Sequence, residues 1–487
     1  MRKTTNPPRV HAHHQAWVEV LDQAPLSTFH YRLWILATAG PLLSGVSMML
    51  LGIVLPLLRA DFRLHPSTMG LIAACLMGGT ILGALLSGHL ADRFGRRPLL
   101  LANAAGLVLA GFLLSFVEGS LGLGVGELLL GIAIGGDFPV GSSFISEFMP
   151  QSHRGRMLAG AMALQPLGML VAAGIALALL GSGQQSWRYL MAVQALFGIP
   201  YFLGRWTLPE SIRWLIAHGR NHDAAQVLTR IAPKQQEQWQ RMAKELGRTM
   251  HQASKLRSIP HNRWLVLLAS EYRRRTILVT IPWFLMDMAT YGIGLFTPLL
   301  LSEILPHTTF TAAWQRDWID TLNSLRVNSF LLLGALLALF LIPRLGRIRM
   351  QILGFLGMGL GLLLLWASLW LHGDALLLLA AFAFYNLAMT AGPNATTFIL
   401  PTEMYPTQVR GIGSGFAAAF AKLGATLAVF LLPILQERLG GGAVIALMAV
   451  LSAAAALLTF AFRVEGQGLS LEQHQGPQPL RVRKIQG

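Results

Sequence analysis

The chain has 487 residues, of which 54% are hydrophobic and only 12% are charged, a balance too apolar for a soluble protein of this length. It is therefore predicted to lie in a lipid bilayer. The formal net charge of +16 could indicate a nucleic-acid partner, but the basic residues gather in the segments between apolar stretches, which argues against a nucleic-acid-binding face.

The first 32 residues are polar and basic and run directly into an apolar stretch, without the short apolar core and cleavage site of a signal peptide. A helix needs about 20 mainly apolar residues to cross a bilayer. The chain offers twelve such segments, at residues 33–58, 66–90, 98–117, 121–146, 157–180, 187–206, 276–301, 327–343, 351–371, 375–400, 411–434 and 442–462. The sequence thus predicts an all-α membrane protein with twelve transmembrane helices, six on either side of a polar loop.

The distribution of basic residues predicts the orientation of these spans. If both termini lie inside, 31 of the 38 Lys and Arg residues fall in the inner tails and loops, as the positive-inside rule requires. The others are Arg59, Arg63, Arg188, Arg316, Arg326, Arg438 and Lys422. We therefore expect a multi-pass protein of a bacterial-type cell inner membrane, with both termini in the cytoplasm.

The connection between the second and third spans, Gly88–Arg97, combines an acid at a helix end with closely spaced arginines. Asp92, Arg93 and Arg96 can form charge-assisted hydrogen bonds to neighbouring helix ends, and so act as a latch that is made in one state and broken in another. Orientation by positive charge alone would explain the arginines but not Asp92. The corresponding loop of the second half, Pro343–Arg347, has proline in place of the acid, so its latch is expected to be weaker.

The string Glu-x-x-Pro-x-x-x-Arg-Gly begins at Glu147 and again, 256 residues later, at Glu403. A repeat at about half the chain length indicates two copies of one helical bundle, which place a substrate site between them near the bilayer midplane. The pattern therefore predicts a transporter. Glu147 with Arg154, and Glu403 with Arg410, are candidate gating residues, with static salt bridges at helix ends as the alternative.

The duplication also predicts how the chain is divided. The expected parts are a cytoplasmic N-terminal tail at 1–32, a six-helix bundle at 33–206, a cytoplasmic central loop at 207–275, a second six-helix bundle at 276–462 and a cytoplasmic tail at 463–487. Short surface helices are expected in the central loop at 221–231 and 235–250, and the longest external loop at 303–325.

Ionisable groups inside a span cost about 2.5–3.5 kcal/mol each at the helix centre, and so they mark function by default. Four of the ionisable residues in the predicted spans stand out: Glu127, Asp137, Asp287 and Lys422. A spacing of four residues places Trp283, Asp287 and Tyr291 on one helix face. A carboxylate beside two aromatic rings can bind a polar solute, or carry a proton whose presence allows an anion to bind. The alternative is a fixed ion pair between Asp287 and Lys422.

The loop Gly88–Arg97 resembles the signature loop of the major facilitator superfamily, and this resemblance covers essentially the whole chain. Pro209–Leu215 after the sixth span and Gly468–Glu472 after the twelfth resemble the sugar-porter branch. The resemblance implies two pseudo-symmetric six-helix bundles that rock around a central site, and a cytoplasmic gate built from the duplicated Glu and Arg residues.

Several strings are similar to those of phosphate:proton symporters, notably Gly135–Pro139, Gly392–Phe398 and Ala421–Ala425. This similarity implies a central site at which Lys422 supplies positive charge. The residues that it implies as solute contacts are Gln165, Trp283, Asp287, Tyr291 and Asn394. The candidate proton-coupling residues are Asp137, Asp287 and Glu127.

The chain departs from those symporters at three places. Phe138 stands where they have tyrosine, Ser44 and Ser47 stand where they have coupling aspartates, and Glu127 replaces an arginine. Other strings resemble metabolite:proton symporters for organic acids and nicotinate-like solutes. We therefore expect a secondary active transporter of a small metabolite, such as an organic acid, by proton symport. An inorganic phosphate:proton symporter and a sugar or metabolite uniporter are the alternatives.

A solute sensor that does not transport is a hypothesis of another class, but such receptors usually carry a long cytoplasmic extension. An enzyme is not expected, because no nucleophile–base or metal-ligand set is present. His11, His13 and His14 lie in the polar leader and do not indicate a metal site. The predicted partners are a small-molecule substrate, protons and lipid, with no cofactor and no metal, and the chain is expected to be a monomer.

Overall fold

The computed structural model describes residues 21–180, 185–231, 263–304, 313–371, 375–405 and 409–464, with a few isolated positions between 237 and 244. Every regular element in these ranges is a helix. The helices are α2 (Thr28–Ala37), α3 (Ala39–Phe62), α4 (Pro66–Phe94), α5 (Arg96–Ser115), α6 (Ser120–Phe148), α7 (Gln151–Leu179), α8 (Ser186–Arg205), α9 (Ile212–Ala217), α10 (Asn221–Ile231), α12 (Arg263–Leu268), α13 (Ser270–Ile304), α14 (Ala313–Leu345), α15 (Arg347–Trp370), α16 (Ala375–Ala391), α17 (Pro393–Met404), α18 (Arg410–Leu439) and α19 (Gly441–Phe462).

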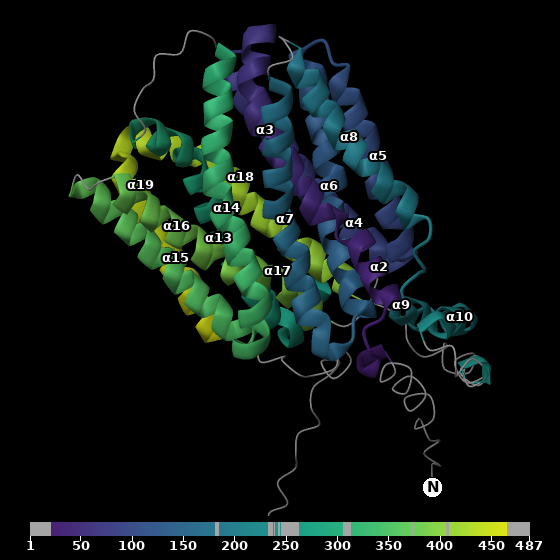
Figure 1. Ribbon diagram of the computed structural model, residues 1–487. Helices are drawn as coiled ribbons and strands as arrows, with labels where there is room; N and C mark the ends of the chain where they lie inside the picture. The colour runs from purple at the N-terminus through teal and green to yellow at the C-terminus, as the bar shows by residue number, and fades with distance from the viewer. Residues whose placement is uncertain are drawn as a thin grey trace, which may run out of the picture.

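The long helices form two groups, α2–α8 on the right of Figure 1 and α13–α19 on the left. The groups meet along two helix pairs, because α4 packs against α18 and α7 packs against α14. These pairs occupy corresponding places in the two halves of the chain, as the duplication leads one to expect. We call the end at which α2 begins and α9 and α10 lie the inner face (Figure 1); the charge pattern predicts that it is cytoplasmic.

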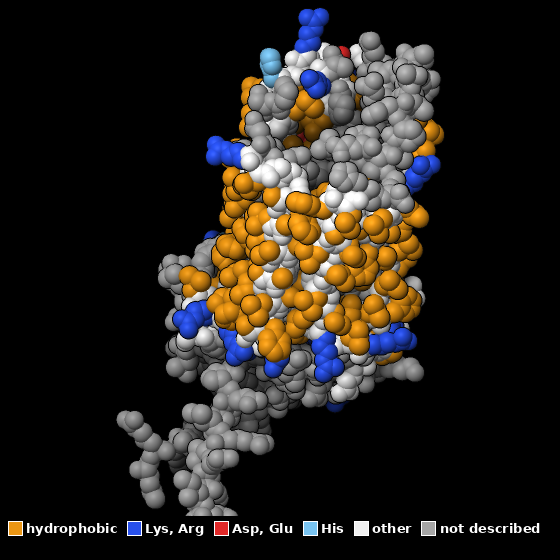
Figure 2. Space-filling model, turned by 90° about the vertical axis from the view of Figure 1, so that its left-hand side faces the viewer, with side chains coloured by type: hydrophobic (Ala, Val, Ile, Leu, Met, Phe, Trp, Pro, Cys, Tyr) orange, Lys and Arg blue, Asp and Glu red, His pale blue; other side chains and the backbone are white. Residues whose placement is uncertain are grey.

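Ten helices or consecutive helix pairs in the described ranges are long and apolar enough to cross a bilayer. The other two predicted spans correspond to α8 and α13, which pack against α5 and α18 respectively. On α15, Leu353, Leu356 and Leu360 are exposed while Phe355 and Met358 are buried. Figure 2 shows the resulting belt of hydrophobic side chains, with Lys and Arg along its lower edge. Such a belt is the surface that lipid covers.

Two predicted spans, 33–58 and 375–400, are broken into two helices each. The first breaks at Thr38 between α2 and α3, and the second at Gly392 between α16 and α17. Proline follows both breaks, because Pro41 lies in the first turn of α3 and Pro393 begins α17. Proline lacks an N–H group, which the first turn of a helix does not need, so a new helix can begin there.

The expectation of an external loop at 303–325 is wrong in part, because α14 begins at Ala313. Only its later part, Asn328–Leu345, has the apolar composition of a span, and polar residues outside lipid are free to continue the helix. The surface helix predicted at 221–231 is confirmed as α10. Most of the one predicted at 235–250, the three leader histidines and residues 465–487 lie outside the described residues.

Candidate transport site and inner gate

A cluster of polar side chains lies where the two groups of helices meet, at the level of the bilayer centre. Gln165 is the middle residue of α7 and Asp287 is the middle residue of α13. Lys422 lies close to the midpoint of α18. Because each helix is long enough to span the bilayer, these positions place the three side chains near the midplane.

The central contact is an ion pair within the second half of the chain. Nζ of Lys422 lies 2.9 Å from Oδ2 of Asp287 and donates a hydrogen bond to the Tyr291 hydroxyl at 3.0 Å. The same ammonium group lies 4.8 Å from the centre of the Tyr291 ring, in cation–π geometry. The Trp283 side chain also hydrogen bonds to Asp287. The face predicted from the spacing of Trp283, Asp287 and Tyr291 therefore surrounds a single charged pair.

Sequence reasoning missed Met48 on α3, whose sulfur joins the two halves. The Tyr291 hydroxyl donates to Sδ of Met48 at 3.6 Å, across the interface. The Gln165 amide and the Ser44 hydroxyl each donate to the same sulfur at 3.9 Å. A thioether is a weak acceptor and methionine is a flexible side chain, so three donors share one poor partner. Met48 could not be singled out from the sequence, because an apolar residue in an apolar span carries no charge signal.

Asn394 lies in the first turn of α17, just after the Gly392 break, and is half-buried. None of the hydrogen bonds among the described residues joins its side chain to Asp287, Tyr291 or Lys422. Its predicted contact with solute stays a prediction.

The structure places Asp137 away from this cluster, in an ion pair with Arg205. The two carboxylate oxygens of Asp137 accept hydrogen bonds from Nη1 and Nη2 of Arg205 at 2.6 and 2.7 Å. Arg205 also donates to the backbone carbonyls of Leu36 and Leu100, and both charged side chains are buried. Arg205 ends α8, and sequence analysis counted it with the inner loop. This geometry ties Asp137 to the packing of α2, α5, α6 and α8.

We predict that Arg205→Leu lowers the stability of the protein, by about 3–5 kcal/mol, because it leaves the buried Asp137 carboxylate without its partner. The melting temperature of detergent-solubilised protein measures this effect. Arg205→Leu combined with Asp137→Asn should recover part of the loss, and Arg438→Leu, which removes an exposed arginine, serves as the control. An unchanged melting temperature for Arg205→Leu would show that the pair contributes nothing to folding.

Glu127, near the outer end of α6, is buried at 1% exposure. Neither of its carboxylate oxygens has a hydrogen-bond partner among the described residues. An isolated buried carboxylate is costly, so the neutral, protonated side chain is expected in this state. One turn before Glu127 on α6, Gly124 packs against α4, since a Cβ added to this glycine would lie 3.6 Å from the Cys75 sulfur.

At the inner face, Asp92 joins the two halves of the molecule. Its carboxylate accepts hydrogen bonds from the backbone N–H groups of Gly411 and Ile412, at 3.0 and 2.8 Å, at the start of α18. The helices approach closely here, since a Cβ added to Gly88 would lie 2.5 Å from the Gly411 carbonyl oxygen. The structure does not bring Arg93 to this contact, because its side chain is exposed and lies over Phe94.

The duplicated motifs pair differently from the arrangement that the sequence suggested. Oε1 of Glu147 lies 2.9 Å from Nη2 of Arg96, in its own half, and 2.8 Å from Nη1 of Arg410, in the other half. Glu403 instead pairs with Arg347 at 2.9 Å. Glu147 lies in the last turn of α6 and Arg154 lies in the first turn of α7. Their closeness in sequence therefore does not decide which residue each of them pairs with.

Arg154, the counterpart of Arg410, donates to Asp22 at 2.6 Å. Asp22 precedes the first span in a segment that sequence analysis treated as a polar tail. The predicted gating residues therefore lie together at the inner face, apart from Arg93, but in pairs that the motifs did not specify.

Glu210, in the Pro-Glu-Ser string after α8, stabilises the turn that carries the Arg96 side chain. Its carboxylate accepts hydrogen bonds from the backbone N–H groups of Arg96 and Arg97, at 2.8 and 3.2 Å. Burial raises the pKa of the Glu210 carboxyl, and these N–H donors oppose that rise by favouring the ionised form. Gly95 begins this turn with a φ of +103°, a backbone conformation that residues with a side chain rarely adopt. The Glu210 carboxylate occupies the space in which a side chain at this position would lie.

Two groups of membrane-spanning helices, a charged pair near the midplane where the groups meet and a salt-bridged closure at one face are the features of a membrane transporter built from two helical bundles. The chain matches the family described as sugar (and other) transporter over residues 35–476, and so belongs to that family, within the major facilitator superfamily.

Three known proteins illustrate the likeness. The chain is 28% identical to the inner membrane metabolite transport protein YgcS of Escherichia coli (strain K12), covering 93% of this chain and 95% of the relative. It is 26% identical to a probable inorganic phosphate transporter 1-12 of Oryza sativa subsp. japonica, covering 85% and 83%.

The third is the solved structure of the proton:xylose symporter XylE bound to 6-bromo-6-deoxy-D-glucose. It superimposes with a TM-score of 0.77 at 21% identity, covering 92% of this chain and 98% of that one. The predicted twelve-helix major facilitator fold is confirmed, and these relatives are transporters rather than enzymes, as predicted.

Proposed function

We propose that the chain carries a small organic anion across a bacterial inner membrane together with a proton. The observation that carries the proposal is the Lys422–Asp287 ion pair, 2.9 Å long, at the centre of the molecule. With both groups charged, the pair has no net charge and attracts an anion only weakly. Protonation of Asp287 leaves Lys422 as an unpaired positive charge, which an anion can neutralise.

In this scheme proton and anion binding favour each other, and by linkage each raises the affinity of the other by the same factor. A coupling free energy of about 1–3 kcal/mol corresponds to a factor of about 5–150 in affinity. One proton and one monovalent anion move together, so the loaded site has the same net charge as the empty one. One chain supplies both halves of the site, which supports function as a monomer.

Met48 supports the assignment of an anion as substrate. The hydroxyls of Ser44 and Tyr291 and the amide of Gln165 all donate to its sulfur in this structure. A carboxylate oxygen is a much stronger acceptor than a thioether. We propose that the oxygen of the substrate takes the position of the Met48 sulfur, and that the flexible methionine side chain moves aside.

The apolar surroundings favour a carboxylate with a hydrocarbon body over inorganic phosphate or a sugar. Trp283 and Met286 are buried beside Asp287 on α13. Met389 of α16 accepts a hydrogen bond from Thr290 of α13. Phosphate remains the second candidate, because relatives named as phosphate transporters align over most of the chain. The serines of α3 suit a uniporter, since Ser47 donates to Gln194 at 2.7 Å and is not a proton carrier. Glu127, which is buried and has no hydrogen-bond partner among the described residues, is the second candidate coupling group.

A thermal-shift screen tests the substrate class. Purified protein is compared with and without benzoate, nicotinate, gluconate, phosphate and glucose at pH 5.5 and 7.5, since a ligand at 100 times its Kd adds about 2.7 kcal/mol of stability. We expect an organic anion to stabilise the protein more strongly at pH 5.5, where Asp287 is more often protonated. A response to phosphate alone, or to glucose alone, would replace the proposed substrate class.

The Asp287→Asn variant tests the coupling. Lys422 then has no carboxylate partner at either pH, so anion binding should persist and lose its pH dependence. In proteoliposomes, an imposed pH gradient should drive accumulation by the natural protein and not by Asp287→Asn, which should still exchange anion for anion. Binding that keeps its pH dependence in the variant would place the coupling proton elsewhere. Binding without any flux in the natural protein would support a sensor.

A further inference from the structure

Residues 21–23 are helical, lie ahead of α2 and are held against the inner face of the molecule through Asp22. Leu21 is 1% exposed and Asp22 is 7% exposed. Such burial is unusual for a polar segment that precedes the first membrane span. Oδ1 of Asp22 accepts hydrogen bonds from Nη2 of Arg154 at 2.6 Å and from Nη2 of Arg213 at 2.7 Å. All three side chains are at least nine-tenths buried, so this is a built cluster rather than a surface contact.

The duplication shows what this carboxylate does. In one arm of the inner gate, Glu147 of the first half pairs with Arg410 of the second half at 2.8 Å. By symmetry Glu403 should pair with Arg154, but Glu403 pairs with Arg347 of its own half, and Arg154 donates to Asp22. Asp22 thus supplies the negative charge for the second arm of the gate.

The charge balance of the cluster depends on Asp22. Arg154 lies close enough to Arg213 and Arg410 to be repelled by both, and it is attracted first by Asp22 and then by Glu403. Arg213 also donates from Nε to the backbone carbonyl of Glu147 at 3.1 Å, so it links Asp22 directly to the residue that closes the first arm. Without the Asp22 carboxylate, buried guanidinium groups would face one another, which is strongly unfavourable.

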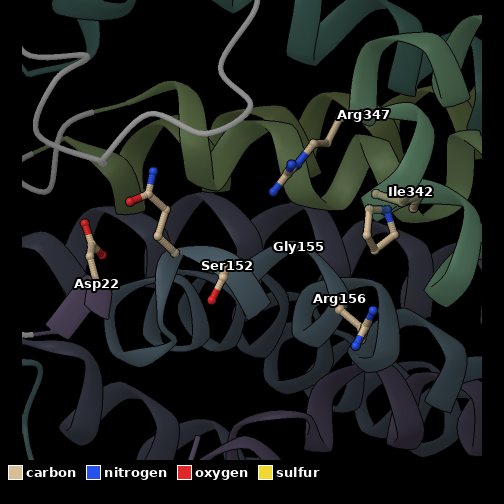
Figure 3. A pocket seen from close by; sticks show the side chains of 8 residues that line it. Asp22, Ser152, Gly155, Arg156, Ile342 and Arg347 are labelled. Carbon is tan, nitrogen blue, oxygen red and sulfur yellow. The ribbon is translucent and has the colours of Figure 1, made fainter. Parts of the chain in front are cut away.

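Asp22 also borders the place where the inner face has to open. A cavity of about 360 Å³ lies between the two halves, lined by Asp22, Gly155 and Arg156 from the first half and by Ile342 and Arg347 from the second. Figure 3 shows Asp22 at one side of this cavity and Arg347 at the other. Movement of α7 away from the α14–α15 turn would widen the cavity and change the surroundings of Arg154.

We propose that Asp22 is a positioning residue of the inner gate, and that it holds Arg154 and Arg213 in the closed state. The segment ahead of α2 is then a working part of the transport machinery, and the gate opens only when the Asp22–Arg154–Arg213 cluster loosens or moves as a unit. The proposal concerns the balance between closed and open states in the absence of substrate, so it does not depend on which solute is carried.

Distances between spin labels at the inner face test the proposal. The sole cysteine is replaced by Cys75→Ser, and labels are attached through Arg93→Cys in the first half and Arg349→Cys in the second, both exposed positions. In Asp22→Asn we expect the population with the longer distance to rise about tenfold or more over the natural sequence. Asp223→Asn on α10, which breaks the exposed pair with Arg220, should leave the distribution unchanged.

Asp22→Glu keeps the negative charge and provides a second test in case the neutral variant Asp22→Asn does not fold. It should fold and give a distribution between those of the natural protein and Asp22→Asn. If Asp22→Asn, or Asp22→Glu where the neutral variant does not fold, gives the same distances as the natural protein, Asp22 has no role in the gate. A fall in melting temperature without a change in the distances of the folded protein would likewise make Asp22 merely structural and overturn the proposal.

Discussion

Lys422→Met is expected to reduce uptake of the anionic substrate by at least about 100-fold, which corresponds to about 2.7 kcal/mol of lost binding. The variant keeps a side chain of similar length but removes the only positive charge that contacts Asp287 and Tyr291 in the described site. Asp287 then remains at the bilayer midplane without its positively charged partner, and its ionised form would repel an anion. Uptake of radiolabelled substrate into proteoliposomes at pH 5.5 measures the effect.

Two further variants separate loss of charge from loss of fold. Lys422→Met combined with Asp287→Asn has no buried charge at this position, so it should recover the melting temperature but not anion uptake. Lys422→Arg retains the charge and should keep a fraction of the activity. Anion uptake by Lys422→Met within a few-fold of the natural protein would remove the central argument for an anionic substrate and would favour a neutral solute.

Much of the central site could be predicted because it depends on features within single helices. The spacing of Trp283, Asp287 and Tyr291 follows from the period of one helix, and the cost of placing a charge in lipid singled out Asp287 and Lys422. Their 2.9 Å contact, raised from the sequence only as an alternative, depends on how α13 packs against α18. Met48 escaped prediction because an apolar residue in an apolar helix carries no signal until its neighbours are known.

The inner gate shows the opposite case, in which residues were predicted and partners were not. Repeated strings identify which side chains are charged and at which helix ends they stand. They do not say which helix end lies opposite, and the structure connects Glu147 to Arg410 and Arg154 to Asp22. Arg205 was missed for a related reason, since a basic residue at the end of a span resembles any other positive-inside charge until Asp137 is found beside it.

The second large effect is expected from Glu147→Gln, because one oxygen of this side chain holds two fully buried guanidinium groups, those of Arg96 and Arg410. Glutamine retains an acceptor but not the charge, and removing one partner of a buried pair costs about 3–5 kcal/mol. The cost falls on the state in which the inner face is closed, so the equilibrium should move towards the inward-open state. Net uptake should fall at least about tenfold.

Glu403→Gln is the matched control, because it alters the same position of the duplicated motif. Among the described residues Glu403 forms a salt bridge with Arg347 alone, within its own half, and Arg347 is less completely buried than the guanidinium groups that Glu147 holds. Glu403→Gln should therefore open the inner face much less than Glu147→Gln in the spin-label experiment. Equal effects of the two variants would mean that the gate is symmetric in function despite its unequal contacts. A larger effect of Glu147→Gln would show that the Asp92–Glu147 side carries most of the closing free energy, as expected where Pro343 has replaced the second acid.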